Sequence, residues 1–238
     1  MDSLSPLVNN RIEQARYRFI TSNEEGSLPQ SFIHILPIKP ISQNGPQCGI
    51  VALTMALQYL TGEEITVESI FDKAVANGYT KQGEMFDAED LSSLSSHLLI
   101  ISTVIYPIPS PSILIDYLLT NQCILIPYDC DRNHEPSNRK GIAAHWAIIV
   151  GVIMIDKVDG DIVPLVKSTT VIDDIDRFYV LAYHGKSKHL GVWSYRELIE
   201  SNGQLREVGD NRKEDFIVKD ITLGGLRDKC VVLKRSIL

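Results

Sequence analysis

The apolar residues of this chain change their spacing at Cys123. Before that point they recur three and four positions apart, as in Ile50, Leu53, Leu57 and Leu60, which is the period of an amphipathic helix. After it they form short runs typical of buried strands, at 123–128, 143–155, 178–184, 190–193, 216–218 and 230–233. Helices followed by strands predict an α+β fold, with a helical lobe first and an antiparallel sheet second.

Turn and capping signals divide the rest of the chain. They predict strands over 31–38 and 99–106, and helices through 11–19, from Cys48 to Gly62, from Thr66 to Gly78, after Asp87, from Pro111 and over 194–201. Residues 1–30 are polar and predict an irregular lead-in, whereas 31–238 are expected to form one compact domain of two lobes. The charge-rich stretch 156–176 is expected to be an exposed insertion between two strands.

The charge balance argues against two classes of partner. The chain has 23 Lys and Arg residues against 30 Asp and Glu residues, a net charge of −7. Because nucleic acids and anionic membranes both select basic surfaces, we expect neither as a partner. The longest apolar run, 143–155, is broken by His145 and Gly151 and is shorter than a bilayer span.

The four cysteines, at positions 48, 123, 130 and 230, predict free thiols. No two of them have the spacing of a zinc or redox Cys pair. Cys123, Cys130 and His134 match no common zinc pattern and lack a fourth ligand, so no metal or cofactor is expected. Residues 1–10 show no signal-peptide pattern, which favours a cytoplasmic protein with reduced cysteines.

Cys48 is the candidate nucleophile because it stands at the start of a helix. The unpaired N–H groups and the positive dipole end of a helix N-terminus favour the thiolate. The Cys48 N–H and the Gln43 side-chain amide could together hold a developing oxyanion. Gly49 would let a substrate backbone approach closely. A lone cysteine at such a position is more often a small buried residue, but the neighbours 43–49 favour acyl-transfer chemistry.

His145 is the candidate base among the six histidines. It opens the nearly continuous apolar run 146–150, where an imidazole is costly unless it has a partner or a role. The alternative is a core histidine with a satisfied hydrogen bond. A thiol nucleophile elsewhere in the chain favours the functional interpretation.

Three sequence blocks resemble those of the actin maturation protease family, a branch of the papain-like cysteine peptidases related to the double-glycine leader peptidases. They are Gly45-Pro46-Gln47-Cys48-Gly49, Ala144-His145-Trp146-Ala147 and Gly185-Lys186-Ser187 followed by Trp193-Ser194-Tyr195. The resemblance runs from about Ile35 to Leu238 and implies a papain-like fold. It implies a cysteine aminopeptidase that removes the acetylated N-terminal Met or Cys from immature actin.

The resemblance also implies roles for individual residues. Cys48 becomes the nucleophile, His145 the base and Gln43 the oxyanion donor. Leader peptidases place an Asp, and papain-like enzymes an Asn, where this chain has His184. His184 is therefore the candidate third member, whose imidazole could accept the Nδ1 proton of His145 and would orient it more weakly than a carboxylate. The nearby acidic residues Asp173, Asp174 and Asp176 are the alternatives, but their sequence is typical of a solvated loop.

Partners follow from the same resemblance. Vertebrate members carry a proline-rich leader that engages profilin, but residues 1–30 here contain only Pro6 and Pro29, which disfavours profilin docking. An actin N-terminus is acidic, so we expect a local basic rim at the cleft. Its candidates are the two groups that flank the His145 and His184 strands: Arg132, Arg139 and Lys140, and Lys186 and Lys188.

Two alternatives remain at this stage. The chain could be a papain-like thiol hydrolase or transferase with another peptide substrate, because fold and dyad do not determine the substrate. It could also be a non-catalytic binding module with the same fold, which the joint presence of Cys48, Gln43 and His145 disfavours.

Overall fold

The computed structural model describes residues 5–17, 31–95, 100–155, 174–209 and 215–236, so most of the expected insertion at 156–176 lies outside the described residues. The helices are α1 (Pro6–Tyr17), α2 (Cys48–Thr61), α3 (Val67–Ala76), α4 (Ala88–Ser93), α5 (Pro111–Leu119) and α6 (Tyr195–Gly203), with a 3₁₀ turn at Ile175–Arg177. The strands are β1 (Ser31–Ile35), β2 (Ile100–Ile105), β3 (Cys123–Asp129), β4 (Ala144–Ile155), β5 (Phe178–Tyr183), β6 (Gly191–Ser194) and β7 (Cys230–Arg235).

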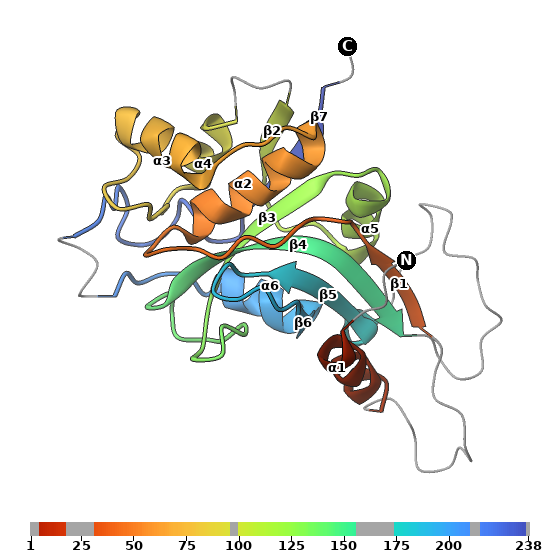
Figure 1. Cartoon of the computed structure of the whole chain (residues 1–238). Helices are drawn as coiled ribbons and strands as arrows, with labels where there is room; N and C mark the ends of the chain where they lie inside the picture. Colours follow the sequence, from red (N-terminus) through yellow and green to blue (C-terminus); the bar gives the residue numbers. More distant parts are fainter. Residues whose placement is uncertain (1–4, 18–30, 96–99, 156–173, 210–214, 237–238) are drawn as a thin grey trace, which may run out of the picture.

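All seven strands join one antiparallel sheet (Figure 1). Its order is β2-β7-β3-β4-β5-β6, and β1 pairs with the part of β4 that extends past the first residues of β3. The first half of β4 pairs with β3, from Ala144 to Ile149, and its second half pairs with β1, from Gly151 to Ile155. The long β4 strand therefore joins all the parts of the sheet, and His145 lies near its first residue.

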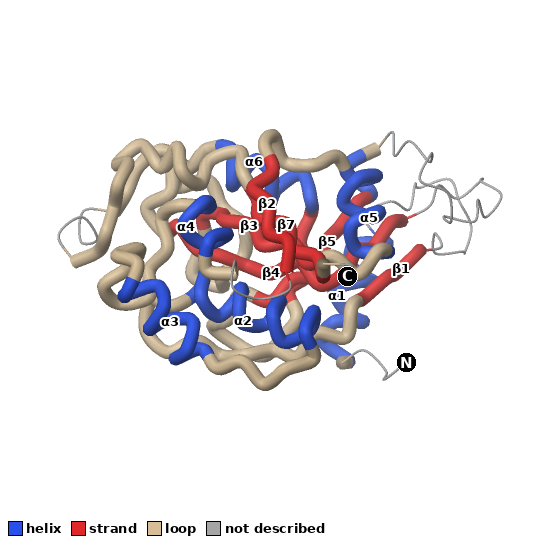
Figure 2. The backbone as a smooth tube through the Cα atoms, turned by 90° about the horizontal axis from the view of Figure 1, so that it is seen from above, coloured by secondary structure: helices blue, strands red, loops and turns tan. Residues whose placement is uncertain are grey.

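Helices cover both faces of the sheet (Figure 2). Helix α2 packs against β3, β4 and β7, while α6 packs against β3, β5 and β6 on the other side. Every residue of β3 is buried as a result, as are nearly all of those in β4. Strands buried on both faces need continuous apolar runs, which explains why the sequence of this region does not alternate.

The α+β prediction and the order of its elements are confirmed, with local differences. Residues 216–218 are not a strand, because the Ile217 N–H donates to the Glu84 carboxylate (3.0 Å) rather than to a neighbouring strand. The helix predicted through 11–19 begins earlier, at Pro6, and α1 buries Val8, Ile12 and Ala15 in the core. Among the described residues no helix is long and apolar enough to cross a membrane.

Candidate active site

A pocket of about 240 Å³ lies between the start of α2 and the start of β4. Its walls combine chemically active side chains with an apolar surface. The first group includes Gln43, Cys48, His134, His145 and Lys186, and the second includes Met85, Phe86, Trp146, Phe216 and Leu226. The two residues that the sequence singled out as nucleophile and base, more than ninety positions apart, therefore face one cavity.

Cys48 is the first residue of α2 and is half-buried. The first hydrogen bond inside this helix runs from Val51 N–H to the Gln47 carbonyl, and the Gln47 side chain does not cap the helix. The N–H groups of the first turn thus point toward the pocket end, where they favour a thiolate and could donate to an oxyanion. Burial raises the pKa of Cys123 and of Cys230 to about 12, so those thiols stay protonated.

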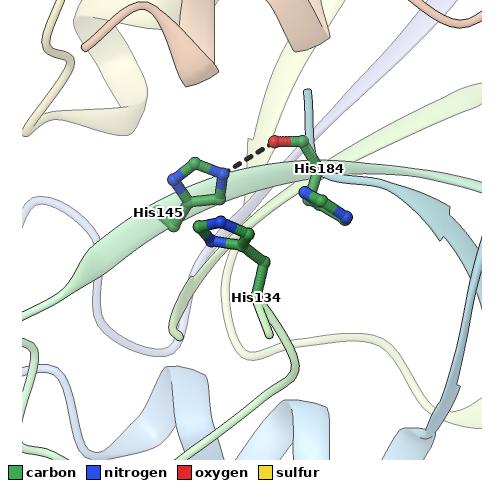
Figure 3. A group of neighbouring side chains, drawn as sticks. All are labelled: His134, His145 and His184. Carbon is green, nitrogen blue, oxygen red and sulfur yellow. Dashed lines mark hydrogen bonds between the residues drawn. The ribbon is translucent and has the colours of Figure 1, made fainter. Parts of the chain in front are cut away.

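His145 is buried, and its ring orientation is set by a main-chain group. Its Nε2 lies 2.7 Å from the carbonyl oxygen of His184 (Figure 3). A carbonyl can only accept, so Nε2 carries the proton and Nδ1 of the neutral ring is the basic nitrogen. The expected contact between the His184 imidazole and the Nδ1 proton is therefore wrong. The orienting group is the His184 main-chain oxygen, and the nitrogen it binds is Nε2.

The His184 side chain is buried beside this contact. Its Nδ1 accepts a 3.3 Å hydrogen bond from the Lys186 N–H. Burial, with His145 and His134 nearby, lowers the pKa of His184 to about 4, so the ring is neutral at pH 7. A neutral ring adds no charge to the pocket.

Gln43 lines the pocket in a fixed orientation. The Gln43 main-chain N–H donates to the Gly185 carbonyl (2.7 Å), and the side-chain Nε2 donates to the Gly45 carbonyl (2.6 Å). Gly185, at φ +75°, leaves room for this packing, because a Cβ there would lie 3.1 Å from the Gln43 Oε1. That Oε1 is buried with no hydrogen-bond partner among the described residues. Unsatisfied buried groups are rare enough to need an explanation, and a functional role is one.

Gly49 does not contribute to the pocket, contrary to the expectation that it lets a substrate approach. It is buried, and a Cβ there would lie 3.0 Å from the Met85 Cβ and 3.1 Å from the Trp146 Cδ1. Trp146 in turn donates its indole N–H to the Met85 carbonyl (2.8 Å). The missing side chain at Gly49 therefore lets α2 pack against β4 and the 80–86 loop.

The expected basic rim is reduced to one lysine at the pocket itself. Lys186 lines the pocket and is exposed. Arg139 and Lys140 are exposed but are not among the lining residues, and Lys140 pairs with Glu207 at 3.3 Å. Their sequence proximity to His145 is misleading because this part of the loop lies against residues 206–207, where the Lys140 carbonyl accepts the N–H groups of Arg206 and Glu207 (2.8 Å each).

His134 is a pocket residue that the sequence analysis did not select. It adopts φ +62° on the 130–143 loop, and its ring stacks on those of His145 and His184 (Figure 3), with centroid separations of 5.6 and 5.1 Å. Burial lowers its pKa, with contributions from His145 and Lys186. A histidine in a polar loop has no local signal for this position. The sequence indicates a partner for His134 only through Cys130, four residues earlier. In the structure the Cys130 Sγ lies 3.8 Å from the His134 Nδ1.

Two buried carboxylates hold the pocket walls. The Glu84 carboxylate accepts N–H groups from Lys81, Gln82 and Ile217, which joins the 80–86 loop to residues 215–218. Burial alone would raise the pKa of Glu84, but these hydrogen bonds together outweigh it and lower the pKa. Asp129, at the end of β3, accepts backbone N–H groups of the 130–143 loop. The segments that carry Met85, Phe216 and His134 are thereby positioned by charge-assisted hydrogen bonds.

Comparison with solved structures identifies the fold. A chain described as a C39-like peptidase from Bacillus anthracis has this fold, with a TM-score of 0.51 and 10% sequence identity over 85% of this chain and 97% of that one. This likeness shows that the chain has the fold of a C39-like, papain-type peptidase, and here that fold brings a cysteine at a helix start and a histidine of β4 to one pocket.

Sequence comparison identifies the family. The family model "Actin maturation protease-like, C-terminal domain" matches residues 38–153. Actin maturation protease of Danio rerio is 33% identical over 214 residues, which cover 80% of this chain and 69% of the relative. The Drosophila melanogaster protein of the same name is 32% identical over 215 residues, 86% of this chain and 72% of the relative. The chain belongs to the actin maturation protease family.

Proposed function

We propose that this cysteine peptidase removes the acetylated first residue, Met or Cys, from immature actin in the cytoplasm. The observation that carries the proposal is the meeting of Cys48 and His145 in one pocket of a chain whose relatives are named for actin maturation. The apolar side of the pocket supports it, since Met85, Phe86 and Phe216 offer a surface for a methionine or cysteine side chain.

In the first step His145 acts through its Nδ1. Because Nε2–H is held by the His184 carbonyl, Nδ1 takes the proton of the Cys48 thiol, and the resulting imidazolium keeps its bond to that carbonyl. The thiolate attacks the carbonyl carbon of the acetylated first residue. A C–S bond forms and the carbonyl oxygen becomes an oxyanion.

The oxyanion is held by two donors. One is the Cys48 N–H at the start of α2, and the other is the second N–H of the Gln43 Nε2, whose first goes to Gly45. On collapse the C–N bond breaks, and His145 gives its proton to the departing amine of the second residue. Water, deprotonated by the same Nδ1, then hydrolyses the thioester and releases the acetylated amino acid.

Residues after the scissile bond of actin are acidic, whereas the protein carries a net charge of −7. Long-range attraction is therefore weak, and recognition needs a local cation. We expect Lys186 to make this contact, because it lines the pocket. No metal takes part in this scheme, and we do not expect profilin to be required.

The decisive experiment incubates the protein with N-acetylated actin and measures the mass of the actin N-terminus. We expect loss of one acetylated residue with the native chain and none with Cys48→Ala or His145→Ala, both of which should keep the fold because neither removes a large apolar group. No loss with the native chain would refute the actin substrate.

A labelling experiment distinguishes an enzyme from a binding module with the same fold. At a pH of about 6 an ordinary thiol is almost wholly protonated, whereas an activated one is not. We expect iodoacetamide to modify Cys48 rapidly and Cys123 and Cys230 slowly, because burial raises their pKa to about 12. Uniformly slow labelling would favour the binding module.

A further inference from the structure

Three histidines from three segments converge beside the proposed nucleophile. His134 comes from the 130–143 loop, His145 from β4 and His184 from the residue after β5 (Figure 3). One ring nitrogen of each lies within 4.8 Å of one ring nitrogen of the other two. The proposed mechanism uses the His145 ring and the His184 carbonyl, so it leaves the imidazoles of His134 and His184 without a task.

The hydrogen bond of His145 suits a metal ligand as well as a base. Ligating histidines usually give one nitrogen to the ion and donate the other N–H to a carbonyl or carboxylate, which fixes the tautomer. His145 already has this outer contact, from Nε2 to the His184 carbonyl (2.7 Å). Its Nδ1 is therefore the nitrogen that an ion would meet.

The donors around the cluster select the kind of ion. The Cys48 thiol lines the same pocket, and the Cys130 Sγ lies 3.8 Å from the His134 Nδ1. The carboxylate among the lining residues, Glu84, is engaged by three backbone N–H groups. Imidazole and thiolate donors suit Zn²⁺ and other borderline or soft ions, whereas Ca²⁺ and Mg²⁺ require oxygen.

We propose that His134, His145 and His184 form a reversible Zn²⁺ site with the Cys48 thiolate as fourth ligand, and that its occupation switches the peptidase off. An ion bound to the His145 Nδ1 and the Cys48 sulfur removes the base and the nucleophile together, and its binding releases the thiol proton. The inhibition rests on the proposed function, but the binding of the ion does not.

The geometry indicates a reversible site rather than a structural one. The His134 ring is within 28° of parallel to its two neighbours, and the donor nitrogens are up to 4.8 Å apart. Zn–N bonds of about 2.0–2.1 Å in a tetrahedron require nitrogens only about 3.3 Å apart. The side chains must rotate inward, and the Cys48 sulfur, which is not among the grouped donors, must move toward them. The His184 Nδ1 must also give up its bond from the Lys186 N–H, because the neutral ring has no other lone pair. This rearrangement lowers the affinity below that of a preformed site.

The test titrates the full, metal-free chain with Zn²⁺ against a chromogenic chelator, and with Co²⁺ as a spectroscopic probe. His134→Asn is the informative variant, because asparagine tolerates the φ of +62° and lacks the imidazole. His189→Asn is the matched control, because His189 is exposed and lies outside the cluster. Thermal unfolding checks that both variants fold.

We expect one Zn²⁺ per native chain and a Co²⁺ spectrum with tetrahedral and thiolate bands. His134→Asn should weaken binding at least about tenfold, since even outer-shell changes cost about 10- to 100-fold. His189→Asn should bind as the native chain does, and Cys48→Ala should lose the thiolate band. Absence of binding at micromolar Zn²⁺, or equal binding by the His134 and His189 variants, would overturn the site.

Peptidase assays with and without Zn²⁺ keep the two proposals separate. Inhibition of the native chain that a chelator reverses, and that needs more Zn²⁺ in His134→Asn, supports the switch. Zn²⁺ binding that leaves turnover unchanged would overturn the switch alone. A chain that binds Zn²⁺ as described but does not trim actin would instead contradict the proposed substrate.

Discussion

Replacing Asp129 by asparagine should destabilise the fold by about 3–5 kcal/mol. The side chain is fully buried; its Oδ1 accepts the Ala143 N–H (3.0 Å), and its Oδ2 accepts the N–H groups of Arg139 (2.6 Å) and Gly141 (3.0 Å) and the Gln204 Nε2 (3.2 Å). In Asp129→Asn the amide keeps its oxygen toward the three Oδ2 donors, so its NH₂ group replaces Oδ1 and faces the Ala143 N–H. One lost bond to a charge costs about 1.5–3 kcal/mol and the change of the other three from charged to neutral acceptors costs about 1 kcal/mol each, while water reaching the exposed loop recovers part of this.

Urea unfolding monitored by tryptophan fluorescence measures the loss as a lower midpoint at an unchanged slope. Asp131→Asn is the matched control in the same loop. The Asp131 side chain accepts two hydrogen bonds, from the Asn133 and Glu135 N–H groups, and both are made to Oδ1. Asparagine retains this oxygen, so Asp131→Asn should lower the free energy of unfolding by less than about 1 kcal/mol. An Asp129→Asn variant within about 1 kcal/mol of the native chain, or a control equally unstable, would refute the reasoning.

Further predictions concern three residues of the pocket. Gln43→Ala should lower kcat by about 10²–10³-fold, the cost of one oxyanion donor, and an unchanged rate would exclude that role. His184→Ala keeps the main-chain acceptor, so kcat should fall less than about tenfold rather than the about 10⁴-fold of a lost triad carboxylate. The pKa of His184 is about 4 in the folded chain against an ordinary 6.5, so the contribution of this residue to stability is complete above pH 6.5 and is lost as the pH falls toward 4. The free energy of unfolding measured across that range should therefore change less steeply with pH in His184→Ala than in the native chain. An equal dependence on pH would contradict this. Lys186→Glu should raise the KM for acidic peptides, and added salt should raise the KM of the native chain. Lys188→Glu is the control and should have little effect, because Lys188 lies outside the pocket lining. Equal effects of the two substitutions would refute contact by Lys186.

Much of the fold could be predicted because its signals are local. The period of Ile50 to Leu60 and the stop at Gly62, which adopts φ +73° and caps α2, determine that helix without reference to the rest of the chain. Thr66 likewise caps α3 through the Ser69 N–H. The strand predicted at 216–218 is wrong because a short apolar run looks the same in the sequence whether its N–H groups bind a neighbouring strand or, as here, the Glu84 carboxylate.

The candidate site divides in the same way. The order of elements sufficed to predict an α+β fold, and the papain-like peptidase fold followed from the resemblance of residues 43–49, 144–147 and 185–195 to a known family. Cys48 and His145 could be selected because a thiol at a helix start and an imidazole in an apolar strand are visible in the sequence itself. Tertiary structure alone decided that the His184 carbonyl binds His145, that Gly49 serves packing and that His134 stacks in the pocket. Every residue has a main-chain carbonyl, and only the path of the chain determines which one a buried imidazole meets.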